Sequence, residues 1–133
     1  MVCQGGRQHR LVESVADSTK WKLIMIREIR AFYGIVPIKN GQRVVGWDDW
    51  TPYAGPIGVQ ATFTFWPEKG VTEDPYPTGR VYGDLDKLCR NLLDALQQSG
   101  LIKDDNLVAS LSAVKRWCKE GEPPGVHFVI TTL

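Results

Sequence analysis

Residues 84–100 read DLDKLCRNLLDALQQSG, and this stretch decides the architecture of the second half of the chain. Its apolar side chains recur three and four residues apart, which is the spacing of one face of an α-helix. They are Leu85, Leu88, Cys89, Leu92 and Leu96. Gly100 follows at the place where a glycine often ends a helix, because glycine adopts left-handed backbone angles without strain. The pattern predicts a helix from near Asp84 to about Ser99.

Strands are predicted before and after this helix along the chain. The residues from Val59 to Trp66 alternate in polarity, as in a strand with one buried face. That face holds Val59, Ala61, Phe63 and Phe65. After the helix, residues 107–117 are predicted to be extended, and residues 126–132 alternate as a final strand. Prolines and glycines crowd residues 67–83, and this density predicts a long loop without regular structure.

A second amphipathic helix is predicted in the first half of the chain, from Asp17 or Ser18 to about Tyr33. Its expected apolar stripe is Trp21, Met25, Ile29 and Phe32. Before it, a short strand is expected at Leu11 and Val12. After it, Asn40-Gly41 between apolar residues predicts a tight β-hairpin.

The predicted elements run strand, helix, strands, helix, strand, strand. This order predicts an α/β (α+β) fold, in which a mixed β-sheet is packed by two main helices. A length of 133 residues and an apolar content of 43% suit one domain over residues 1–133 with a hydrophobic core.

Composition and charge narrow the class of protein. Sixteen basic and fifteen acidic residues give a net charge of +1, which argues against a protein that holds nucleic acid by bulk positive charge. Three cysteines, with no CxxC pair, argue against a disulfide framework or a zinc ribbon and predict reduced thiols in a cytoplasm. The longest aliphatic run, residues 23–26, is too short to span a bilayer, so we expect no membrane partner.

Aspartates gather at the two ends of the predicted second helix. Asp84 and Asp86 stand at its start, and Asp104 and Asp105 follow it. Carboxylate oxygens are the ligands that Mg²⁺ prefers. We expect the later pair to return towards Asp84 if the strand that follows runs antiparallel to the helix. The alternative is structural: Asp84 caps the helix, Asp86 complements its dipole, and the later pair forms a turn.

The longer string resembles the RusA family of Holliday-junction resolvases, which are endonucleases typical of phages and prophages. The resemblance is carried by residues 83–88, 92–96 and 100, then by Asp104-Asp105 and a strand that ends in basic residues and Trp117. Asp84 and Asp105 are 21 residues apart, which fits the family. A weaker likeness covers residues 4–14.

The resemblance implies that Asp84, Asp86 and Asp105 are catalytic and bind Mg²⁺, for which Mn²⁺ can substitute. Arg90 stands where the family has a catalytic lysine. Its guanidinium can clamp a phosphate but cannot donate a proton, and Lys87 is the nearby alternative cation. The resemblance also implies a homodimer that resolves four-way DNA junctions in the cytoplasm of a bacterial host, without a small organic cofactor.

Two other functions stay open at this point. A branched-DNA-binding module that has lost cleavage is favoured by Arg90 and by the short segment before Gln4. A nuclease for flaps or forks is the other. Candidate phosphate contacts are Arg7, Arg10, Lys115 and Arg116, unless these side chains only face solvent.

Overall fold

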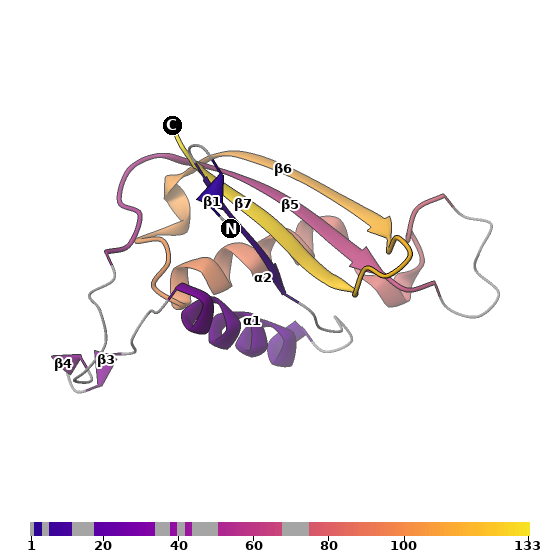
Figure 1. Ribbon diagram of the computed structural model, residues 1–133, viewed down its shortest axis with the longest axis horizontal. Helices are drawn as coiled ribbons and strands as arrows, with labels where there is room; N and C mark the ends of the chain where they lie inside the picture. The colour runs from indigo at the N-terminus through magenta and orange to yellow at the C-terminus, as the bar shows by residue number, and fades with distance from the viewer. Residues whose placement is uncertain are drawn as a thin grey trace.

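The computed structural model describes residues 2–3, 6–11, 18–33, 38–39, 42–43, 51–67 and 75–133, with the side chains of 19–33, 51–67 and 75–133. Figure 1 shows a layer of strands with two helices beneath one of its faces. This arrangement confirms the predicted mixed sheet packed by two main helices.

Five strands form the main sheet in the order β1-β2-β7-β5-β6. They are β1 (Val2–Cys3), β2 (Gly6–Leu11), β5 (Ile57–Phe65), β6 (Val108–Trp117) and β7 (Gly125–Thr132). Neighbours pair antiparallel except β5 and β6, which run parallel. A separate pair, β3 (Ile38–Lys39) and β4 (Gln42–Arg43), confirms the predicted hairpin.

The parallel pair is joined by the second helix. Parallel neighbours need a crossover of a dozen or more residues, which is usually a helix, and α2 (Leu85–Gln98) provides it. Strand β6 begins beside the last turn of α2, where Gln97 contacts Asp105. It then runs back along the helix, so that Lys115 reaches residue 83, just ahead of the helix. Strand β6 is therefore antiparallel to α2 and forms one edge of the sheet.

The hydrophobic core fills the space between the sheet and the two helices. Its members from the strands are Ile57, Val59, Ala61, Phe63, Phe65, Val126, Phe128 and Ile130. Its members from α1 (Ser18–Tyr33) and α2 are Trp21, Met25, Ile26, Ile29, Tyr33, Leu88, Cys89, Leu92, Ala95 and Leu96. The rings of Trp21 and Phe63 lie 6.0 Å apart, which docks α1 onto β5. The alternation predicted for β5 is confirmed.

The last turn of α2 is closed from two sides. Gly100 adopts a φ of +87°, and the N–H groups of Leu101 and Ile102 both donate to the carbonyl of Leu96, as the predicted glycine cap requires. From α1, the guanidinium of Arg30 donates to the carbonyls of Gln98 (3.0 Å) and Ser99 (3.3 Å). A positive charge at this end is also favoured by the helix dipole.

Three sequence-based expectations need correction. The sequence predicts Phe32 in the buried stripe, but Phe32 is 43% exposed and Tyr33 is buried instead, because the four-residue spacing from Ile29 leads to Tyr33. The first strand expected at Leu11 and Val12 is already formed over Gly6–Leu11. The predicted loop contains a short 3₁₀-helix, η1 (Arg80–Tyr82), held by burial of Tyr82.

Neither described helix combines the length and the apolarity needed to cross a membrane.

The corrected stripe of α1 predicts different costs for two truncations. Met25→Ala removes a fully buried side chain and should lower the free energy of unfolding by about 2–5 kcal/mol. Phe32→Ala removes a half-exposed ring and should cost less than about 1 kcal/mol. Urea denaturation measures both. Equal losses would show that Phe32 is a core residue after all.

Candidate active site

An open groove of about 660 Å³ lies between α2 and the edge strand β6. Its apolar lining comes from Leu85, Cys89, Leu93, Leu111 and Ala113, and its polar lining from Asp86, Arg90 and Asp105. Burial raises the pKa of the Cys89 thiol, and the nearby Asp86 raises it further. The thiol therefore stays protonated near neutral pH.

Asp84 stands immediately before α2 in an extended conformation, with φ −82° and ψ 138°. This is the capping position, yet its side chain makes no capping hydrogen bond. The carboxylate is 70% exposed and lies 3.6 Å from the ammonium of Lys87, which is equally exposed. Such an exposed pair contributes little to stability. The capping alternative therefore does not account for Asp84.

Asp86 lies in the first turn of α2 and lines the groove. The positive end of the helix dipole favours a carboxylate there, as the structural alternative supposed. That interaction acts through the field of the backbone and does not occupy the carboxylate oxygens. Asp86 can therefore serve the dipole and still bind a cation.

An aromatic cluster fixes the chain that leads into Asp84. Tyr82 is 4% exposed. Its ring packs edge-on against Phe65 at 5.3 Å and against Trp117 at 5.1 Å, at the ends of β5 and β6. Gly83 follows with φ +80°, and its carbonyl accepts a hydrogen bond of 2.7 Å from Lys115. The entry to α2 is thus attached to the far end of β6.

Asp104 and Asp105 lie at the opposite end of the helix. The carboxylate of Asp104 accepts a hydrogen bond from the backbone N–H of Asn106 at 3.0 Å. Asp104 is therefore the turn residue of η2 (Asp105–Leu107), as the structural alternative supposed. The backbone N–H of Asp105 donates to the side-chain oxygen of Gln97 at 3.0 Å. This contact leaves the exposed Asp105 carboxylate available.

The expected return of Asp105 to Asp84 does not occur within one chain. Strand β6 is antiparallel to α2, but Asp105 precedes that strand and stays beside Gln97. Gln97 lies eleven residues beyond Asp86, which corresponds to about 16 Å of helix. Among the described residues, no three or more acidic, histidine or cysteine side chains gather closely enough to hold a metal ion. Asp84 and Asp86 form one arm of the candidate site, and Asp105 forms a second.

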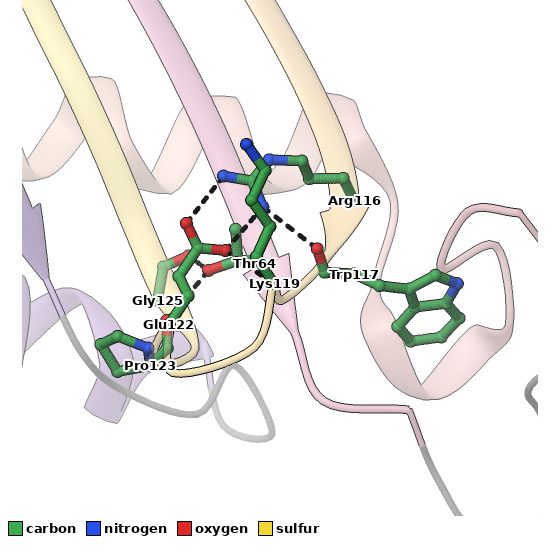
Figure 2. A network of polar contacts seen from close by, with 7 residues as sticks. All are labelled: Thr64, Arg116, Trp117, Lys119, Glu122, Pro123 and Gly125. Atoms are coloured by element: carbon green, nitrogen blue, oxygen red, sulfur yellow. Dashed lines mark hydrogen bonds and ion pairs between the residues drawn. The ribbon is translucent and has the colours of Figure 1, made fainter.

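The positively charged residues predicted for the site lie in different parts of the structure. Arg90 lines the groove with Asp86, Lys87 lies beside Asp84, and Lys115 reaches the carbonyl of Gly83. Arg116 faces the other side of the sheet, with α2 behind the strands in Figure 2. It holds both oxygens of Glu122, at 2.6 and 2.8 Å, and this hydrogen bonding raises the pKa of its guanidinium. Arg116 therefore fastens the turn between β6 and β7.

Arg7 and Arg10 have a described backbone only. They pair with Ile130 and His127 of β7, and their side chains lie outside the described residues. Their register positions belong to opposite faces of the sheet, because they are three residues apart in one strand.

Sequence reasoning missed the supporting residues. Gln97, Tyr82 and Glu122 each hold a turn next to a predicted site residue, through contacts that no short motif encodes. For Gln97, the available signal was a polar side chain in the last turn of a helix that precedes an Asp-Asp turn.

The family model described as "Endodeoxyribonuclease RusA" matches residues 42–131, which is more than half of the chain. The matched segment contains both arms of the site, the groove and the aromatic cluster. The curated proteins contain no significant match to the chain.

The contrast between Asp84 and Asp104 predicts different effects on stability. Asp104→Ala removes a turn-forming hydrogen bond and should lower the free energy of unfolding by about 1 kcal/mol. Asp84→Ala removes no such bond and should change it by less than about 0.5 kcal/mol. Chemical denaturation of the two variants tests this. A loss at Asp84 as large as that at Asp104 would indicate that Asp84 caps α2 in solution.

Proposed function

The chain belongs to the RusA family of endodeoxyribonucleases, and on that basis we propose that it hydrolyses phosphodiester bonds at four-way DNA junctions with the help of Mg²⁺. The observation that carries the proposal is the first arm of the site. Asp84 and Asp86 present two carboxylates at the entry of α2, and Arg90 lies beside Asp86 in the groove.

The donor set of the first arm suits Mg²⁺. The ion is usually held by one or two carboxylates and keeps several waters, and Asp84 and Asp86 supply two carboxylates. When bound, Mg²⁺ lowers the pKa of a water molecule and neutralises charge that develops on the phosphate. The exposure of Asp84 leaves room for those waters and for DNA.

Arg90 and Lys87 would receive the phosphate. The guanidinium of Arg90 can hold two phosphate oxygens at once and stabilise their charge. It stays protonated and cannot transfer a proton, so the proton for the leaving oxygen must come from solvent or another group. Lys87 adds a second positive charge next to Asp84.

Asp105 enters the proposal through a second copy of the chain. One Mg²⁺ binds oxygens at about 2.0–2.1 Å, so it cannot join side chains at opposite ends of α2. In a two-fold dimer with antiparallel α2 helices, Asp105 of each copy would lie near Asp84 and Asp86 of the other. Leu111 supports such a contact, because it lines the groove on the edge strand and is 45% exposed. Two composite sites would then match the two-fold symmetry of a four-way junction.

A binding module without cleavage is the second candidate. It is favoured by Arg90, which occupies the position of the family's catalytic lysine. In this case the chain would bind a junction tightly and form no product with Mg²⁺ or Mn²⁺.

Cleavage of a synthetic four-way junction tests the proposed function directly. The wild-type chain should nick two opposite strands with Mg²⁺, and Asp86→Asn should reduce the rate by at least about a hundredfold, since it removes a charged ligand oxygen. Flap and fork substrates run in parallel decide the preferred structure. No nicking by the wild type, or full activity of Asp86→Asn, would reject metal-assisted cleavage at this arm.

Mixing two inactive variants tests the composite site. In a mixed dimer of Asp86→Asn and Asp105→Asn, one site carries both substitutions and the other carries neither. Random mixing should therefore restore about a quarter of the wild-type sites, detected as single nicks. The matched control mixes Asp84→Asn with Asp86→Asn, which leaves both sites of every dimer defective. If neither mixture nicks the junction, all three aspartates of a site belong to one chain.

A further inference from the structure

Lys115 makes a long-range contact with the segment of chain that leads into Asp84. It lies near the end of β6, in register with Phe63 on the helix side of the sheet. Its ammonium donates to the carbonyl of Gly83 at 2.7 Å, across 32 residues of sequence. No described carboxylate lies within ion-pair distance of this ammonium.

We propose that Lys115 is a positioning residue, which holds the Gly83–Asp84 peptide so that the first arm points its carboxylates at the cation. The inference rests on the proposed function and deepens it. It assigns to Lys115 a task within the protein in place of a direct DNA contact.

The position of the hydrogen bond supports this inference. The carbonyl of Gly83 and the N–H of Asp84 belong to one planar peptide group. A donor fixed on the carbonyl therefore fixes the orientation of the plane that carries the Asp84 backbone. Gly83 has φ +80° and ψ 165°, a conformation that is open mainly to glycine and has no side chain to hold it. Tyr82 anchors the preceding residue, and Lys115 anchors the peptide itself.

The alternative conformation shows why such an anchor is needed. Aspartate is among the preferred helix caps, and a small rotation of the entry would let Asp84 accept a hydrogen bond from the first turn of α2. A capping Asp84 would turn an oxygen away from the cation. In the structure, Asp84 occupies the capping position without the bond. Lys115 holds the peptide in this uncapped arrangement.

The charge of Lys115 argues against a purely structural task. A cation near the N-terminus of a helix is disfavoured by the helix dipole, so a neutral donor would hold Gly83 with less electrostatic cost. The lysine is found all the same at the carbonyl directly before Asp84. The neighbouring Arg116 cannot replace it, because Arg116 is on the other face and bound to Glu122.

Metal binding measured without cleavage tests the inference. Lys115→Met keeps the length of the side chain and removes the ammonium. We expect its Mn²⁺ affinity, followed by electron paramagnetic resonance, to fall about tenfold or more. Lys115→Arg keeps the charge and the donors and should stay within about threefold of the wild type. Lys119→Met, which removes an exposed charge beyond the end of β6, is the matched control and should change nothing.

Steady-state cleavage separates positioning from DNA contact. Loss of a positioning residue should lower kcat and raise the Mg²⁺ requirement, with little change in the KM for the junction. Loss of a phosphate contact would instead raise KM and reduce the salt dependence of binding by about one charge. That second pattern, or unchanged Mn²⁺ affinity of Lys115→Met, would overturn the inference.

The outcomes also separate this inference from the proposed function. If the wild-type chain binds Mn²⁺ but cleaves no junction, the proposed cleavage is rejected. The difference in Mn²⁺ affinity between the wild type and Lys115→Met still decides the inference. A wild-type chain that binds no Mn²⁺ overturns both. If Lys115→Met does not fold, Lys115→Leu replaces it, since leucine also removes the donor to the Gly83 carbonyl.

Discussion

The parallel pairing of β5 with β6 determines where α2 and the residues at its two ends can lie. Parallel neighbours cannot be joined by a tight turn, so α2 must carry the chain back along the length of the sheet. A carboxylate just before the helix and a carboxylate just after it are thereby placed at opposite ends of α2. The sheet topology, more than any single contact, divides the candidate site into two arms.

Each arm is supported by a different neighbour. The entry of α2 is held by aromatic packing around Tyr82 and by the ammonium of Lys115. The exit is held by the Asp104 turn and by the side-chain amide of Gln97. The polar contacts at both ends run from a side chain to the backbone, namely from Lys115 to Gly83, from Asp104 to Asn106 and from Gln97 to Asp105. None of these contacts uses the carboxylates of Asp84 and Asp105.

Much of this fold could be predicted from periodicity, because burial of one face leaves a local trace in the sequence. The stripe of α2, the alternation of β5 and the glycine at residue 100 are such traces. The expectations that failed had two causes. Phe32 was misplaced because three- and four-residue spacings diverge at the end of a helix. The Lys115–Gly83 contact and the separation of Asp105 follow from strand register and direction, which local patterns do not record.

Arg30 has a consequence for the way the molecule opens. Its guanidinium bridges α1 to the last carbonyls of α2, so fraying of the α2 end requires release of a side chain on another helix. The two helices should therefore exchange their amide hydrogens as one cooperative unit. The turn that carries Asp105 follows directly after this clamped end. The Asp105 turn is thus stabilised in part by α1, a helix that lies far from it in the sequence.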